Sequence, residues 1–296
     1  MRIIDLSKHE LVLATGIGAR HGISGHTFEL LEYWWYFRQH NVDVVIMCTA
    51  HKPEVLTALA RERYCFTEAE LDDLANRCYD ATAALLVSLP VVLWVDGCSK
   101  YVPHAAVVAK RQIAFACNNS EEFHSMDIVL GDTRLYDDTV HGHYVKKLLF
   151  SKFRAFACSD EAHDTAMLYC TVQARKLSQD YIDALPERFP QFKKFLLVTN
   201  DNIQSHDCIE VVQHPCGDLF TRFGTYIYSP LKIGWKDAID RVVDCSPRFP
   251  AECTWYKKEI ILDAPISRGL QARLYDCEDL EKIELTKNDN LINLVF

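Results

Sequence analysis

The sequence lacks the features that mark membrane and secreted proteins. No apolar run reaches the roughly 18 residues that a membrane-spanning helix needs. The first residues, Met1 to Asp5, lack the apolar core of a secretory signal. The chain also has no internal repeat and no low-complexity linker. These absences predict a cytoplasmic protein that has no membrane partner.

Metal-binding motifs are scarce as well. Twelve cysteines are present, but none are spaced as Cys-x-x-Cys, and they are scattered through apolar segments of a chain too long to need disulfides. The close histidine pairs are His141 with His143 and His21 with His26. We therefore expect reduced, buried cysteines, no structural metal and no bound cofactor.

The balance of charge is acidic. A formal net charge of -9 argues against a protein that coats nucleic acid indiscriminately. A local basic stripe runs from His141 to Arg154 and contains Lys146, Lys147 and Lys152. It is either a solvated helix face or a surface that contacts phosphates.

The first half of the chain alternates strands and helices. An apolar strand over 10–15 leads into a glycine loop with Gly16 and Gly18, and a helix is expected over 27–40. A buried strand over 42–48 follows, and Thr67 with Glu70 predicts a capping box that starts a helix reaching about Val87. Further strands are expected over 90–95, 112–117, 127–130 and 154–158.

A second alternation follows. Strands are expected over 166–170, 195–199, 208–213, 225–228 and 259–262, with helices around 178–189 and from about Pro247. With 296 residues the chain can form two domains of roughly 150 residues each. The prediction is an α/β protein with two compact Rossmann-like domains facing a cleft, 1–160 and 161–296.

The most informative segment combines the end of the strand at Tyr228 and Ser229 with a helix start near residue 246. Ser246 is a suitable N-cap, and Pro247 suits the first helical turn. The unpaired N–H groups of this helix start, together with Arg248, suit a diphosphate, and Glu252 one turn later suits a ribose diol. The alternative is a plain helix start in which Glu252 forms an ion pair with Arg248.

These residues resemble the GT-B glycosyltransferases, in particular short viral members that include phage DNA glycosyltransferases. The resemblance implies an N-terminal acceptor domain and a C-terminal domain that holds a nucleotide-sugar, whose diphosphate the glycine loop approaches. It also implies a basic donor ligand, Arg175 or Lys176, and a ribose ligand, Glu252. For a viral chain the compartment is the host cytoplasm. The tail after Cys277 is short for the long helix that usually returns to the first domain.

Sugar transfer requires a stabilised diphosphate and, for an inverting reaction, a base. Asp96 follows a strand of the first domain and is the leading candidate, although an Asp-Gly pair is also typical of a simple turn. His21 and His26 are the other candidates, and His26 could instead cap the following helix. The sequence has no Asp-x-Asp metal motif, so we expect metal-independent transfer of either stereochemistry.

Two classes of acceptor are compatible with these residues. The resemblance suggests hydroxymethylated pyrimidines in phage DNA, with Asn118 and the basic stripe on the acceptor side, whereas a glycan or another non-DNA hydroxyl would not need the stripe.

Two other classes of protein are alternatives to a glycosyltransferase. The glycine loop suits an NAD(P)-dependent oxidoreductase, but the segment from Met47 to Lys52 offers no acidic ribose ligand. A binding module without catalysis is the other alternative.

Overall fold

The computed structural model describes the chain in separate stretches: 2–14, 25–48, 52–80, 84–95, 109–115, 128–130, 154, 159–170, 179–199, 203–212, 217–228, 252–253, 256–263, 292–293 and 295–296. The chain divides into two compact units. The first comprises Met1–Arg154 with Ile283–Phe296, and the second comprises Ala155–Lys282.

The first unit contains a parallel sheet. Its strands are β1 (Arg2–Asp5), β2 (Leu11–Ala14), β3 (Val44–Cys48), β4 (Cys78–Asp80), β5 (Ala84–Trp94), β6 (Ala109–Phe115) and β7 (Ile128–Leu130). They pair in the order β4-β3-β2-β5-β6-β7, with β1 beside β5. All the described pairings are parallel. Counted from β2, this is the order 3-2-1-4-5-6 of a doubly wound dinucleotide-binding fold.

The central strands are buried on both faces, as their nearly continuous apolar sequence predicts. All the residues of β2 and β3 are buried. The long strand β5 pairs with β1 along its first half and with β2 along its second half. Pro90 has no N–H to donate, and it lies between these two pairing segments, where its effect on the sheet is small.

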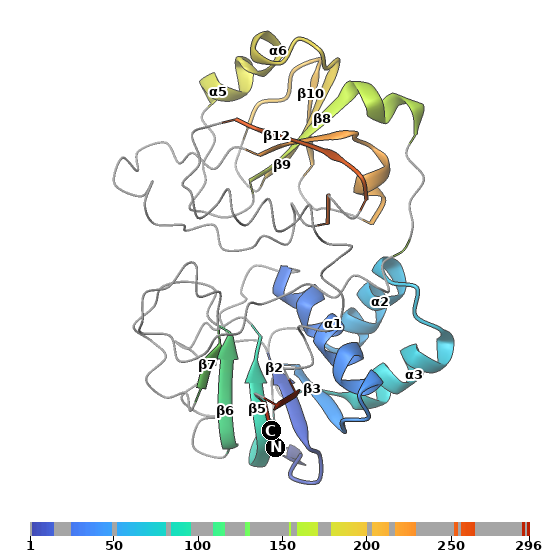
Figure 1. Cartoon of the computed structure of the whole chain (residues 1–296), viewed down its shortest axis with the longest axis vertical. Coiled ribbons are helices and arrows are strands. Elements are labelled where there is room, and N and C mark those ends of the chain that lie inside the picture. Colours follow the sequence, from blue (N-terminus) through green and yellow to red (C-terminus); the bar gives the residue numbers. More distant parts are fainter. Residues whose placement is uncertain are drawn as a thin grey trace. The chain divides into compact units, whose positions relative to one another are not determined.

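Three helices lie together beside β3 in Figure 1: α1 (Gly25–Gln39), α2 (Pro53–Arg63) and α3 (Glu68–Arg77). Helix α2 begins with Pro53, whose missing N–H would have no partner in the first turn. Helix α3 confirms the predicted capping box: Glu70 N–H donates to Thr67 Oγ1 at 3.3 Å, and Thr67 N–H donates to Glu70 Oε2 at 2.8 Å.

Helix α1 is buried on nearly all sides. Trp34 and Tyr36 are buried while Trp35 is partly exposed, because adjacent helical residues cannot share one face. The helix ends at Gln39, and Asn41, with φ 61°, closes it in a Schellman motif in which Val42 N–H donates to the Phe37 carbonyl at 3.1 Å. Within the described residues, no helix is both long and apolar enough to cross a membrane.

The second unit contains a smaller parallel sheet with the same kind of order. Its strands are β8 (Thr165–Cys170), β9 (Lys194–Thr199), β10 (Ile209–Val212), β11 (Thr225–Tyr228) and β12 (Glu259–Leu262). They pair in the order β10-β9-β8-β11-β12. Counted from β8, the order is 3-2-1-4-5, so both units are doubly wound and the predicted α/β class is confirmed.

Both faces of the second sheet are covered. One face packs with the short helices α5 (Gln179–Asp183) and α6 (Leu185–Arg188), through a cluster that includes Ile182 and Leu185. The other face packs with the 3-10 helix η4 (Gly217–Thr221) through a cluster that includes Phe220 and Cys253. A second 3-10 helix, η3 (Asp160–Asp164), leads into β8.

Two predicted helices have different limits in the structure. The helix expected to reach Val87 ends at Arg77, because Cys78–Asp80 pair with β3 and the apolar run from Ala84 pairs with β1 as part of β5. The helix expected around 178–189 is two helices separated at Ala184, because Pro186 cannot donate the bond that would continue α5. Elements β1, α2 and β4 are not among those predicted from the sequence. Of the strand expected over 154–158 only Arg154 is described, and it is assigned to no strand; the start of the helix near Pro247 lies outside the described residues.

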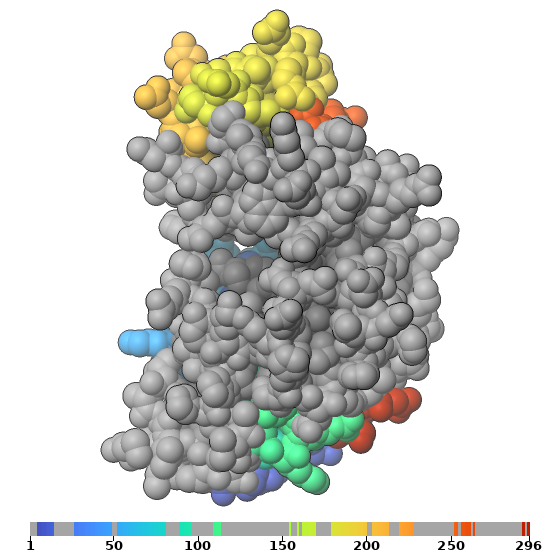
Figure 2. Space-filling view, turned by 90° about the vertical axis from the view of Figure 1, so that its left-hand side faces the viewer, coloured from blue at the N-terminus to red at the C-terminus, as the bar shows by residue number. Residues whose placement is uncertain are grey.

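The C-terminal residues belong to the first unit. Val295 is fully buried, and its carbonyl accepts a hydrogen bond from Arg111 of β6 at 3.2 Å. Figure 1 places the C-terminus near the strands of this unit, and Figure 2 shows the red C-terminal residues beside the green of β6. The domains expected from the sequence, 1–160 and 161–296, do not include this return of the chain.

A charged network joins the segments that lead into the first sheet. Asp43, just before β3, accepts from His9 Nδ1 at 2.9 Å and also from Arg77. Arg77 in turn donates to Asp73 at 2.7 Å, and Asp73 accepts from Arg38 at 2.9 Å. Burial raises the pKa of the Asp43 carboxyl, but the hydrogen bonds from Arg77 and His9 outweigh it, so the pKa lies below its usual value.

We expect Asp43→Asn to make stability less dependent on pH in the acid range. Because the pKa of Asp43 is lowered in the folded state, its contribution is present above the usual Asp pKa and is lost as the pH falls through the folded value. The variant should be less stable by about 0.5–1 kcal/mol at pH 6, a small effect because the carboxylate is partly exposed. Urea unfolding from pH 6 to pH 3 measures this, with Asp72→Asn on the exposed side of α3 as the control. A stability difference that stays constant over this range would contradict the expectation.

Candidate functional site

In the first unit the order of strands reverses between β2 and β5. Open parallel sheets bind ligands at the carboxyl ends of the strands where such a reversal occurs. These two strand ends are hydrogen-bonded neighbours: Ala14 pairs with Trp94, and Val95 N–H donates to the Ala14 carbonyl at 2.8 Å. In the sequence, the predicted glycine loop begins just after Ala14, and Asp96 directly follows Val95. The predicted glycine loop and Asp96 thus follow two neighbouring strand ends at the same edge of the sheet.

The second unit has its reversal between β8 and β11. The two strands are paired through Thr225 with Ala166 and Tyr226 with Met167, and they end at Cys170 and Tyr228. The predicted basic donor ligands come shortly after Cys170 in the sequence, and Ser229 directly follows Tyr228. The two predicted donor-binding segments therefore follow strand ends that are neighbours in the sheet.

Most of the predicted site residues are not among those that the structure describes. His26 is the second residue of α1, and Tyr228 is the last residue of β11; for both, only the backbone is described. Glu252 is described in full. The remaining predicted residues lie outside the described residues, and their roles stay predictions: Gly16, Gly18, His21, Asp96, Asn118, Lys146, Lys147, Lys152, Arg175, Lys176, Ser229, Ser246, Pro247 and Arg248.

Glu252 lies in the last turns of a helix and is almost fully buried. Its carbonyl accepts from Tyr256 N–H at 3.0 Å, and Lys258 N–H donates to the Cys253 carbonyl at 2.8 Å. With φ 56° at Lys257, these bonds form a Schellman end just before β12. The residue is 3% exposed, beside the apolar cluster that contains Cys253. The ribose role of this carboxylate remains a prediction.

Two buried carboxylates of α1 are not among the site residues predicted from the sequence. Glu29 and Glu32 are each 3% exposed, in the turns that follow the start of the helix at Gly25. Tyr64, at the end of α2, donates its hydroxyl to Glu32 Oε1 at 2.8 Å and lies 3.2 Å from the Phe28 carbonyl. A signal was available: two glutamates three residues apart in an otherwise apolar helix share one face, where burial requires polar partners.

The described side chains also bear on metal binding and thiol chemistry. In the described part of the chain, no group of three or more His, Cys, Asp or Glu side chains is placed to hold a metal ion.

Cys48 and Cys78 lie on neighbouring strands, and the hydrogen bond between them, together with burial, raises the pKa of Cys78 well above its usual value. This thiol stays protonated at neutral pH, which argues against a nucleophilic role.

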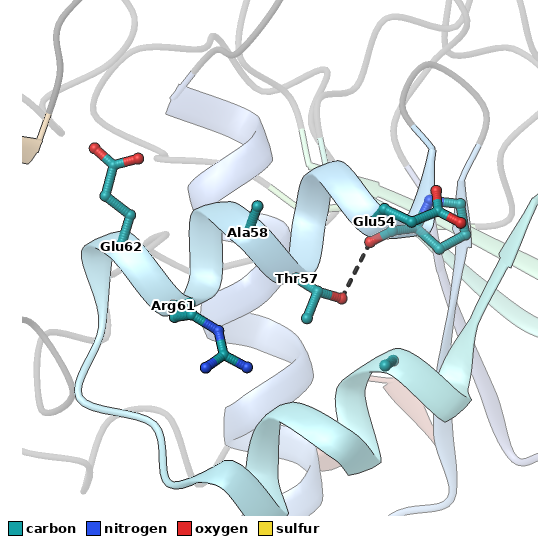
Figure 3. Close-up of a pocket in the computed structure, with 7 residues that line it drawn as sticks. Glu54, Thr57, Ala58, Arg61 and Glu62 are labelled. Atoms are coloured by element: carbon teal, nitrogen blue, oxygen red, sulfur yellow. Dashed lines mark hydrogen bonds between the residues drawn. The ribbon is translucent and has the colours of Figure 1, made fainter.

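A hollow of about 590 Å³ lies beside α2 in the first unit. Its lining includes Thr57 and Arg61 of α2 (Figure 3). Ala75 of α3 also lines it. Thr57 Oγ1 donates to the Pro53 carbonyl at 3.1 Å, and the guanidinium of Arg61 binds both carboxylate oxygens of Glu68 at 2.8 and 2.9 Å. None of the predicted site residues lines this hollow, and its guanidinium already has a carboxylate partner.

No protein-family model and no curated protein matches this chain. Among solved structures, the chain is similar to a mutant O-GlcNAc transferase from Thermobaculum terrenum, with 11% identity over 95% of this chain and 62% of that one, at a TM-score of 0.44. It is also similar to MurG from Acinetobacter baumannii, with 11% identity over 93% of this chain and 91% of that one, at a TM-score of 0.32. The chain thus spans 62% of the length of the first of these proteins. The fold assignment rests on the strand order of the two sheets.

Proposed function

We propose that the protein is a glycosyltransferase that uses a nucleotide-sugar donor. The observation that carries this proposal is the strand order of both units, which gives each a reversal point from which the predicted binding segments leave. The donor binds at the carboxyl edge of the second sheet, where Tyr228 ends β11. The acceptor binds at the carboxyl edge of the first sheet.

The proposed chemistry divides between the two edges. Arg248, with Arg175 or Lys176 and helix N–H groups, neutralises the departing diphosphate, so no metal ion or cofactor takes part. Glu252 accepts hydrogen bonds from the ribose diol. If the reaction inverts, Asp96, or else His21 or His26, takes the proton of the acceptor hydroxyl. The acceptor oxygen then bonds to the anomeric carbon of the sugar as the bond from that carbon to the diphosphate oxygen breaks, and the nucleoside diphosphate leaves with the electron pair.

A thermal-shift screen with UDP, GDP, ADP, CMP, NAD and the corresponding nucleotide-sugars tests the proposal. A ligand that binds only the folded state raises the melting temperature. We expect one nucleoside diphosphate and its sugar conjugate to stabilise the protein.

The first sheet has the strand order of dinucleotide-binding folds, which favours an NAD(P)-dependent oxidoreductase as the second candidate. Stabilisation by NAD alone would establish that alternative instead.

We propose hydroxymethylated pyrimidines in phage DNA as the acceptor, contacted by Asn118 and the stripe with Lys146, Lys147 and Lys152. Reversing the charge of the first two lysines, Lys146→Glu with Lys147→Glu, is then expected to abolish transfer to such DNA, because phosphate contacts supply much of the affinity. Transfer of radiolabelled sugar to hydroxymethylated DNA measures this. Lys8→Glu with Lys52→Glu, at two exposed positions, is the control with an equal change in charge. Full activity of the first variant would point to a glycan or another acceptor that lacks phosphates.

A further inference from the structure

A carboxylate with little exposure to water marks the carboxyl end of β12. Asp263 directly follows this strand, and the pairing of Tyr228 with Leu262 places the end of β12 beside the end of β11. The side chain of Asp263 is only 9% exposed. Tyr181 of α5 donates its hydroxyl to one carboxylate oxygen, and Arg188 of α6 donates to the other. Both oxygens therefore bind residues of the two short helices.

These helices depend on tertiary contacts for their position. Helix α5 has five residues and α6 has four, too few to persist alone in water. Ile182 and Leu185 anchor them to the apolar face of the sheet. The guanidinium of Arg188 lies over the ring of Tyr181, 5.0 Å from its centroid, so the two residues that bind Asp263 also support each other.

The hydrogen bonds from Tyr181 and Arg188 to Asp263 join two parts of the chain that follow strand ends at the carboxyl edge of the second sheet. Helix α5 is the first described element after β8, and Asp263 is the first residue after β12. In the sheet, β11 lies between β8 and β12, and β8 and β11 are the two strands on either side of the reversal point. Tyr181 and Arg188 thus join α5 and α6 to the end of β12, which lies on the other side of β11 from β8. An unpaired carboxylate at this burial is costly, so loss of either partner disturbs the position of α5.

We propose that Asp263 is a positioning residue for donor binding, acting through Tyr181 and Arg188 to hold α5 at the carboxyl edge of the second sheet. The inference rests on the proposed function, because it assumes that a nucleoside diphosphate binds at this edge. Asp263 itself does not contact the reacting atoms. Its effect on the nucleotide-sugar is indirect, through the position of α5.

Calorimetric titration of the full chain with UDP, GDP and ADP tests this inference. Asp263→Asn removes the charge at nearly constant size, and it is expected to weaken binding of the diphosphate that the wild type prefers by about tenfold. Asp164→Asn is the matched control, because Asp164 pairs with the exposed Lys193 just before the amino ends of β8 and β9. This control is expected to change the affinity less than about twofold, as is usual for an exposed ion pair.

A merely structural role would lower the melting temperature and leave the affinity unchanged at a temperature where the variant is folded. Two further variants separate these outcomes. Tyr181→Phe keeps the ring and loses only the hydroxyl, so it decides the question if the Asp263 variants fail to fold; a loss of about threefold is expected. Arg188→Ala should weaken binding much less in the Asp263→Ala background than in the wild type, because partners of one interaction are not additive.

Two results would overturn the proposal in different ways. Wild-type affinity in folded Asp263→Asn, or in Tyr181→Phe if the former does not fold, removes the positioning role and leaves the proposed function intact. A wild-type protein that binds none of the three diphosphates removes the proposed function together with the inference.

Discussion

Glu252→Ala is expected to weaken binding of the nucleotide-sugar by about 2–3 kcal/mol, or roughly 30- to 150-fold, the range for lost hydrogen bonds to a charged group. The reason is that a ribose diol has two hydroxyl donors, which a carboxylate can accept together. Glu252 is 3% exposed in the free protein. A nucleotide-sugar whose ribose is hydrogen-bonded to Glu252 therefore binds a carboxylate that is already shielded from water. This shielding strengthens each hydrogen bond between the ribose and the carboxylate.

Titration with the donor identified by the screen measures this effect. Glu252→Gln keeps the size of the side chain and one acceptor oxygen, so it should retain part of the affinity. Glu259→Ala is the control in the same part of the chain: Glu259 is exposed at the start of β12 and accepts from Thr225 Oγ1 at 3.0 Å. Because a buried residue can also support the fold, each variant must show the circular dichroism of the folded state. Wild-type donor affinity in folded Glu252→Ala would remove the ribose assignment.

Much of the architecture could be predicted because the strands of parallel sheets have a simple signature. Strands buried on both faces need nearly continuous apolar residues, and β2, β3 and β9 show this pattern without interruption by charge. Local chemistry also placed the start of α3, since the hydrogen bonds between Thr67 and Glu70 involve only neighbours in the sequence.

Several failures occurred where a distant partner decides the structure, whereas the missed helix α2 has a local start signal in Pro53. Ala84 begins a strand because β1 lies beside it, and β1 is itself a short segment without clear alternation. Strand β4 has three residues, and it exists only through its pairing with the end of β3. The return of Val295 to Arg111 joins residues separated by most of the chain. None of these contacts has a local sequence signal.

The candidate site divides in a similar way. The positions after strand ends, such as Asp96 and Ser229, could be proposed because chain order alone places them at the edge of a parallel sheet. The partners of buried carboxylates could not be proposed. Tyr64 for Glu32, and Tyr181 with Arg188 for Asp263, come from helices whose packing angle the sequence does not reveal.

Phe220→Ala is expected to lower the free energy of unfolding of the second unit by about 3–5 kcal/mol, the range for removing a large aromatic side chain from a core. Phe220 is 1% exposed. Its ring centroid lies 4.5 Å from that of Tyr256 and 5.8 Å from that of Phe223. These rings cover the sheet face that carries Met167 and Tyr226, so the vacated volume cannot close without moving β8 and β11.

Urea unfolding followed by near-ultraviolet circular dichroism measures the loss, since it reports on aromatic packing. Phe296→Ala is the matched control, because it deletes the same side chain at a position that is 50% exposed. It should change stability by no more than about 0.5 kcal/mol. Since β8 and β11 border the reversal point, the Phe220 variant should also lose donor affinity before it unfolds globally. Equal stability of the two variants would mean that Phe220 does not lie in the core described here.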